Sequence, residues 1–450
     1  MHRDCNGLVV TTASEAALTA FDRAVAGYVH YRADTGDRLS ALLAADPECA
    51  MGHCLKGYFA MLGYNRSLLP VARTAAADAR RWSAHVTMRE QAHIAALEAW
   101  VELHPDGAVA IWDDILREYP RDVLAFRLAH FVNFWFGRPD LMLASVRRVE
   151  PHWSAALPDW GTLLACRCFA LEECGHYAEA EAAGRAAIDR DPTDLWAAHG
   201  VAHVLEMQGR RAEGILWIDG LRDNWAEANN LRHHLWWHAA MFHIEHRDTD
   251  AALALYDTQF RDLRAWLTLA QPDLYIDVQN AASMLFRLER LGVPVGDRWG
   301  ELADKAEARI GDCLSAFTLP HWMLALAAAG RLDAAERMIA AMRDFGSADG
   351  VIAEQVREWA LPVCSAILAA AKGRPAEAVR LMRPALGSMY RLGGSHAQQD
   401  ALEQVYLDAA LRAGLADDVR LILERVAGQR PVPPARRVGY AEAAVAQNFH

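Results

Sequence analysis

The chain has 450 residues, of which 53% are apolar and 23% are charged. This composition excludes a chain that is disordered throughout, because it supplies ample material for a buried core. The 46 basic and 58 acidic side chains leave a formal net charge of −12, which argues against a nucleic-acid partner because the chain has no overall basic field for phosphates.

Two further classes of protein are disfavoured by the apolar and cysteine patterns. No run approaches the roughly 20 consecutive apolar residues of a membrane span, and Met1–Val10 lacks the basic and apolar regions of a secretory signal. We therefore expect a cytoplasmic protein with no membrane partner. The eight cysteines include no C-x-x-C pair, which is typical of buried thiols and argues against a disulfide framework or a zinc knuckle.

Helices are predicted from one end of the chain to the other. Apolar residues recur at spacings of three and four almost everywhere, whereas alternating runs of β-branched and aromatic residues are scarce. Proline marks several predicted helix starts, at Asp46-Pro47, Tyr119-Pro120 and Asp191-Pro192. Glycine turns precede Ala-rich segments at Gly175, Gly209, Gly330, Gly373 and Gly414. The fold class is therefore predicted to be all-α.

The glycine turns follow the pattern of tetratricopeptide repeats. Residues 175–192 read as the second half of such a repeat, and the step from Ala180 to Gly214 is 34 residues, the tetratricopeptide period. The same small-residue position recurs at Ala108, Met142, Ala180, Gly214, Ala252, Ala335, Ala378 and Val419. The other steps are longer, and the interval from Ala252 to Ala335 leaves room for two units.

We predict an α-solenoid of stacked helical hairpins with a concave inner surface. It comprises eight to eleven units in a single domain, residues 1–427. Residues 428–450 are expected to form a Pro-rich tail along the surface, because the prolines between Gly428 and Arg437 are too stiff for a helix interior. Shortly before it, Ser395 and Gln398 have the spacing of a capping box at a helix start.

Two pairs of histidines stand out from the 19 in the chain. His199 and His203 are four residues apart, as are His234 and His238, and this spacing places both imidazoles of a pair on one helix face. The second pair follows the first by 35 residues, close to one repeat. Glu206 lies three residues after His203 on the same face. Glu245 lies seven residues after His238. We therefore expect four imidazoles and one or two carboxylates to converge between stacked helices.

Such a set suits two kinds of chemistry. Neutral imidazoles bind zinc, iron, nickel or manganese, so His199, His203, His234 and His238 are a candidate metal set. The same residues suit acid–base catalysis, because histidine titrates near neutrality; His203 or His238 then acts as the base, and Glu206 orients it or carries the proton. The alternative is that these histidines line a groove or are satisfied core residues.

Short motifs follow one another in a fixed order along most of the chain. They are Asp46-Pro47 with Met51-Gly52-His53, Arg89-Glu90-Gln91 with His93, Pro192-Thr193-Asp194 through Met207, His234 with Trp237 and His238, Tyr256-Asp257-Thr258, Asp277 with Ser283-Met284-Leu285, His321, Leu361-Pro362 with Cys364, and Gly393-Gly394-Ser395 with Ala397, Gln398 and Asp400. In this order the chain resembles the tetratricopeptide repeat protein 38 family up to about residue 427.

The resemblance implies a tetratricopeptide-like helical domain and no agreed biochemical activity. His396 and Gln399 depart from the family's pattern, and the C-terminal tail lies outside it. Of the motif positions, the candidate ligand-binding residues are His199, His234, Trp237, His321 and Asp277.

Two functions stay open. The first is a small-molecule pocket around the histidines, acting by acid–base or metal-dependent chemistry of the hydrolase, lyase or isomerase type. The second is a non-enzymatic tetratricopeptide scaffold that binds a peptide or protein partner. The pocket is favoured because the polar residues concentrate on two units beside Trp and Met, whereas a peptide groove is lined over several successive units. The sequence decides neither between enzyme and scaffold nor between monomer and homodimer.

Overall fold

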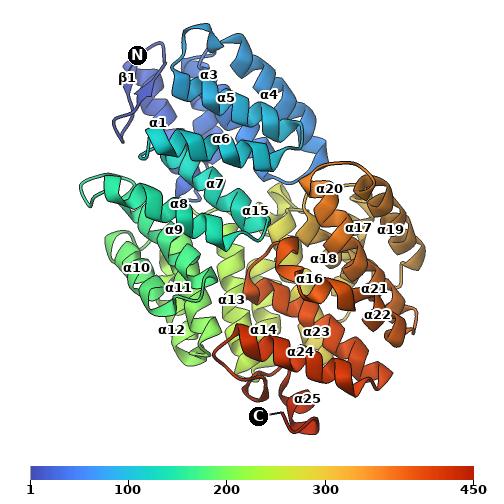
Figure 1. The fold of residues 1–450 in the computed structure, drawn as a ribbon. Coiled ribbons are helices and arrows are strands. Elements are labelled where there is room, and N and C mark those ends of the chain that lie inside the picture. Colours follow the sequence, from blue (N-terminus) through green and yellow to red (C-terminus); the bar gives the residue numbers. More distant parts are fainter. Residues whose placement is uncertain (1, 450) are drawn as a thin grey trace. The chain divides into compact units, whose positions relative to one another are not determined.

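The computed structural model describes residues 2–449, and within them it is all-α apart from one small hairpin of two strands. Consecutive helices, joined by short turns, pack on one another as hairpins (Figure 1). The predicted fold class, a tetratricopeptide-like stack of helical hairpins, is therefore confirmed. None of the described helices has both the length and the apolar character that crossing a bilayer requires.

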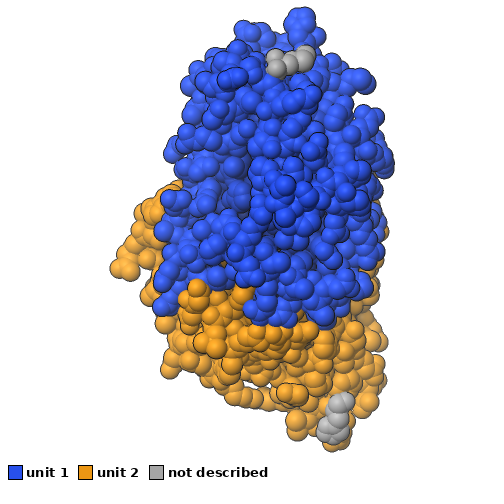
Figure 2. Space-filling model, turned by 90° about the vertical axis from the view of Figure 1, so that its left-hand side faces the viewer, with its two compact units in different colours: residues 1–201, 221–232 blue, residues 202–220, 233–450 orange. Residues whose placement is uncertain are grey.

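The chain forms two compact units, coloured separately in Figure 2. Unit 1 comprises residues 1–201 and 221–232, and unit 2 comprises residues 202–220 and 233–450. Helices α11 (Leu195–Met207), α12 (Arg211–Leu221) and α13 (Leu231–Glu245) contribute residues to both. The single domain over residues 1–427 stays a prediction.

Unit 1 opens with the strand pair β1 (His2–Arg3) and β2 (Val9–Val10), which is antiparallel with His2 opposite Val10. Its helices follow as α1 (Glu15–Val29), α2 (Thr35–Ala45), α3 (Ala50–Leu62), α4 (Leu69–Arg81), α5 (Met88–Val101), α6 (Pro105–Glu118), α7 (Val123–Trp135), α8 (Pro139–Val149), α9 (Trp160–Glu173) and α10 (Tyr177–Arg190). Short 3-10 turns occupy η1 (Arg66–Leu68), η2 (Ser83–His85), η3 (Glu150–His152) and η4 (Arg222–Asn224).

Unit 2 continues the hairpins with α14 (Thr249–Leu255), α15 (Trp266–Ala270), α16 (Tyr275–Arg290), α17 (Arg298–Ala308), α18 (Leu319–Ala328), α19 (Leu332–Gly346), α20 (Val351–Gln355), α21 (Leu361–Ala371), α22 (Pro375–Leu386), α23 (His396–Ala413), α24 (Ala416–Gln429) and α25 (Ala441–Ala446). Two single π-turns, η5 (Tyr256–Phe260) and η7 (Val356–Ala360), extend α14 and α20. The 3-10 turns are η6 (Ala316–Thr318), η8 (Met389–Leu392) and η9 (Pro434–Arg436).

The small-residue position predicted from the repeats lies on the second helix of successive hairpins. Its occupants are buried at all eight places, Ala108, Met142, Ala180, Gly214, Ala252, Ala335, Ala378 and Val419. A small side chain there lets neighbouring helices approach; a Cβ added at Gly214 would collide with the ring of Phe242. The interval from Ala252 to Ala335 contains the hairpins α16–α17 and α18–α19, as its length predicts.

The segment after Gly428 does more than cover the surface. Helix α24 runs to Gln429, and the chain then turns through η9 into α25. Arg437 and Tyr440 are 5% and 1% exposed, because their side chains reach the buried carboxylate of Asp400. Arg437 and Tyr440 therefore contribute to the core of unit 2.

Candidate functional site

Three of the predicted histidines meet in unit 2. His203 comes from α11, and His234 and His238 lie one turn apart on α13. Their ring nitrogens lie within 4.8 Å of one another, and the ring centroid of His238 is 4.5 Å from that of His203 and 4.8 Å from that of His234. All three are at most 2% exposed. The predicted convergence of these imidazoles is confirmed.

His199 lies one turn before His203 on α11, on the same helix face. Its ring packs against Phe169 and Trp196 of unit 1, with centroid distances of 5.1 and 4.7 Å. Within unit 2, His203, His234 and His238 thus form a buried group that could hold a metal ion.

Oxygen acceptors orient two of the rings. Nδ1 of His238 donates to Oε2 of Glu206 over 3.0 Å, and Nδ1 of His234 donates to Oδ1 of Asn280 over 2.7 Å. An ionised carboxylate and an amide oxygen are acceptors only, so Nδ1 of each ring carries a proton. A neutral imidazole protonated there has its lone pair on Nε2. This is the arrangement in which proteins present histidines to a metal or use them as bases.

The protonation states follow from burial and neighbouring charge. Burial, together with the charge of His238, lowers the pKa of His234 to about 3. Burial alone would raise the pKa of Glu206, but the hydrogen bond from His238 and the charges of Arg430 and Arg287 outweigh it, so that this pKa lies below its ordinary value. At neutral pH His234 is neutral and Glu206 is ionised.

A network of ion pairs adjoins Glu206 within unit 2. Asp400 accepts hydrogen bonds from Arg437 and, over 2.8 Å, from the hydroxyl of Tyr440. Arg287 lies 3.4 Å from its carboxylate. Arg430 bridges the two acids, at 3.7 Å from Oε1 of Glu206 and 3.8 Å from Oδ1 of Asp400. The histidine site and the C-terminal segment therefore share one buried charge network.

The remaining predicted ligand residues are buried near structural partners. Nε1 of Trp237 donates to Oγ of Ser283 over 3.1 Å, and its ring stacks on His234 at an interplanar angle of 8°. Nδ1 of His321 lies 2.9 Å from the backbone oxygen of Phe317, and burial lowers the pKa of His321 to about 4. Of the predicted ligand residues Trp237, His321 and Asp277, these contacts place only Trp237 against a ring of the histidine group.

Asp277 forms a pair with His233, which the spacing of the histidines does not predict. Its Oδ2 accepts from Nδ1 of His233 over 3.1 Å, and both residues are at most 1% exposed. His233 immediately precedes His234 on α13, so the two side chains point to different sides of the helix.

The spacing of the histidines predicts none of the further residues of the network: Asn280, Arg287, Asp400, Arg430 and Arg437. Asp400 belongs to a motif that the sequence singles out, but nothing in its spacing links it to Glu206. The signal that could have revealed Arg287 is its charge among the apolar residues of a predicted helix. The predicted capping box is confirmed, since Ser395 and Gln398 exchange side-chain and backbone hydrogen bonds at the start of α23.

No protein-family model matches the chain. Solved structures similar to it include yeast Tom70 (10% identity; 97% of this chain and 89% of that one; TM-score 0.39), the TPR domain of P58(IPK) (13%; 80% and 99%; 0.23) and Naa15/Naa10 bound to HypK-THB (12%; 96% and 67%; 0.27). At such identities and TM-scores the similarities carry no functional argument.

Proposed function

We propose that this chain is a helical-repeat binding protein that engages a protein partner through an exposed apolar surface of unit 2. The observation that carries the proposal is the segment around α15. Leu263, Trp266 and Leu269 are 47%, 57% and 64% exposed within seven residues. Clustered exposed apolar side chains mark interaction surfaces, and tryptophan is prominent among the residues that dominate binding energy.

The same segment is anchored to the unit on its inner side. Leu267 and Thr268 are 4% and 2% exposed. Before them, the buried guanidinium of Arg261 forms two hydrogen bonds with Glu301, of 2.7 and 2.8 Å, and a third with the backbone oxygen of Pro272. These buried contacts fix the backbone of α15. Trp266 and Leu269, three residues apart on this helical turn, therefore lie together on its exposed face. Such preorganisation lowers the entropic cost of binding.

A substrate site at the histidines is the less favoured function because the rings are enclosed. His203 and His238 are fully buried, and His234 is 2% exposed. A reacting molecule would have to displace Trp237 or break the ion pairs that Arg430 makes with Glu206 and Asp400. The surface around α15 needs no such rearrangement.

The partner proposal is tested by substitution on the apolar surface. Candidate partners are first captured from extracts of the native cells on the immobilised chain, identified, and produced in pure form. Each is then titrated against three forms of the chain: the wild type, the double variant Trp266→Ser/Leu269→Ser, and the control variant Leu216→Ser. Leu216 is 72% exposed on α12. We expect binding to weaken at least tenfold in the double variant only. Equal affinity for all three proteins would contradict the proposal.

We propose a metal centre as a second candidate function, formed by His199, His203, His234 and His238. The ring nitrogens of His203, His234 and His238 lie close together in unit 2, and the neutral state of His234 and the oxygen acceptors behind His234 and His238 are what a metal ligand needs. Zinc, iron, nickel or manganese suit such a set, and a bound ion would supply Lewis acidity. It comes second because the positive charges of Arg287 and Arg430 disfavour another cation near Glu206.

Elemental analysis of protein purified without a metal-affinity tag tests this second candidate. We expect about one metal ion in the wild type and in His104→Ala/His176→Ala, whose histidines are exposed, and none in His203→Ala/His238→Ala. Wild-type protein without bound metal would rule out the proposed metal centre. Acid–base roles for His203, His238 and Glu206 would then be tested by screening for turnover that the His238→Ala substitution abolishes.

We further propose that the resemblance to the tetratricopeptide repeat protein 38 family is one of membership. It is supported by the ordered motifs, which include the four histidines, Glu206 and Asp400. The structure of an acknowledged family member tests it: we expect the counterparts of Glu206 and His238 to form a hydrogen bond there, and their separation would contradict the proposal.

A further inference from the structure

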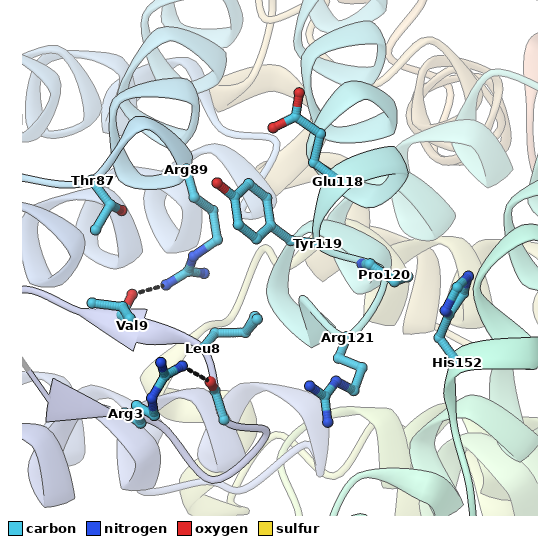
Figure 3. A pocket seen from close by; sticks show the side chains of 11 residues that line it. Arg3, Leu8, Val9, Thr87, Arg89, Glu118, Tyr119, Pro120, Arg121 and His152 are labelled. Atoms are coloured by element: carbon cyan, nitrogen blue, oxygen red, sulfur yellow. Dashed lines mark hydrogen bonds between the residues drawn. The ribbon is translucent and has the colours of Figure 1, made fainter.

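A pocket of about 500 Å³ lies in unit 1, beside the N-terminal strand pair (Figure 3). Its walls are the hairpin from Arg3 to Val9, Thr87 at the start of α5, the connection between α6 and α7 that contains Arg121, and His152 at the end of η3. The volume is within the range of pockets that accept small molecules.

The lining of this pocket is basic although the chain as a whole is acidic. Arg3, Arg89, Arg121 and His152 line it, and Glu118 is the acidic residue among the lining side chains. A local reversal of sign in a chain of net charge −12 concentrates anions at this place.

The three arginines of the pocket differ in whether a carboxylate compensates their charge. Arg89, 4% exposed, pairs with Asp122 over 2.5 Å and donates to the backbone oxygen of Val9 over 2.8 Å. Its charge is thus compensated, and it fixes the hairpin that forms one wall. Arg3 donates to the neutral backbone oxygen of Gly7 over 2.7 Å. Among the described residues, neither Arg3 nor Arg121 forms an ion pair with a carboxylate. Two guanidinium charges at the pocket are therefore uncompensated.

The lining defines the chemical class of the ligand. Guanidinium groups match carboxylates and phosphates through paired hydrogen bonds, and Figure 3 shows Arg3 and Arg121 coming from the hairpin and from the loop between α6 and α7. Leu8, Tyr119 and Pro120 add apolar wall. We propose that this pocket binds a small organic oxyanion, held by Arg3 and Arg121, at a site that is independent of the partner surface and of the histidine group.

Calorimetric titration of the full chain at low ionic strength tests the proposal, with two sets of probes. One set carries carboxylates (succinate and citrate), and the other carries phosphate (glycerol 3-phosphate and glucose 6-phosphate). We expect saturable one-site binding of at least one set, and the set that binds identifies the oxyanion. The affinity should fall at least tenfold in Arg121→Gln and further in Arg3→Gln/Arg121→Gln.

The control is Arg73→Gln, which neutralises an arginine of α4 with a side chain 53% exposed. It should bind as the wild type does. Saturable binding of neither set would overturn the proposal, as would equal affinities of wild type and Arg121→Gln. Because Arg121 is exposed and makes no ion pair among the described residues, its substitution is compatible with folding, which the melting temperature verifies.

Discussion

Replacing Asp400 by asparagine should strongly destabilise unit 2. Asp400 is 3% exposed on α23, and its carboxylate faces Arg437, Arg287 and Arg430. Asparagine has nearly the same shape and retains an oxygen acceptor for the hydroxyl of Tyr440, so the substitution removes the charge with little change in volume. Three buried guanidinium groups then lose their shared counter-charge.

The expected cost follows from this burial. Removing one partner of a buried ion pair typically costs about 3–5 kcal/mol, because the remaining charge stays out of water without compensation. Asp408→Asn is the matched control: Asp408 lies two turns later on α23, with a side chain 35% exposed that contacts Arg412 and Arg290 at 3.5 and 3.9 Å. Exposed pairs contribute about 0–1 kcal/mol, so the control should lose less than about 1 kcal/mol.

The difference between wild type and Asp400→Asn also depends on pH in a defined direction. Burial alone would raise the pKa of Asp400, but Arg437, Arg430 and Arg287 hold it well below its ordinary value. The stability that this carboxylate contributes is therefore fully present above the unfolded-state pKa of about 4 and is lost as the pH falls below it. Asparagine does not titrate, so the two proteins should converge in stability on acidification.

Equilibrium urea unfolding at pH 7, 4 and 3, followed by circular dichroism, measures these differences. Because the chain forms two units, hydrogen exchange of the α23 amides assigns the change to the unit that contains Asp400. The reasoning would be refuted if Asp400→Asn and Asp408→Asn lost the same small amount of stability at pH 7.

Three further predictions concern single residues of unit 2. Gly394 has φ of +76°, and an added Cβ would lie 2.5 Å from the Phe317 ring, so Gly394→Ala should lower the free energy of unfolding by about 2–4 kcal/mol. The control Gly373→Ala, with φ of +73° and no atom within 4 Å of the added Cβ, should lower it by about 1 kcal/mol. Similar losses of stability for the two variants in urea unfolding would contradict this prediction. Ser395→Ala removes a cap of α23 and should cost about 1 kcal/mol, measured in the same way; an unchanged midpoint would show that the cap is dispensable. His321 has a pKa of about 4 in the folded chain against about 6.5 in the unfolded chain. The unfolded state therefore binds the proton first, and the stability of the fold is lost as the pH falls from about 6.5. The stability of His321→Gln should decline less steeply than that of the wild type between pH 7 and 5, and equal slopes would be inconsistent with this assignment.

Much of the fold was predictable because its signals are local. Helix periodicity, the glycine turns and the small residues at one repeat position act over three to four residues or one repeat, and the helical hairpins follow from them. The same holds for the capping box of Ser395 and for the pairing of His199 with His203 and of His234 with His238, since i and i+4 positions share a helix face.

The tertiary structure decided what surrounds these local features. It joined Glu206 to His238, brought Asp400 and Arg430 to Glu206, and enclosed the histidines that the sequence suggested for an accessible pocket. It also placed Arg3 and Arg121 around one cavity. The most distant of these contacts, between Glu206 and Arg430, joins residues 224 positions apart. Such contacts arise from the packing of successive hairpins and the return of the C-terminal segment. Spacing along the chain specifies helix faces, whereas burial and charge pairing depend on which faces the folded chain brings together.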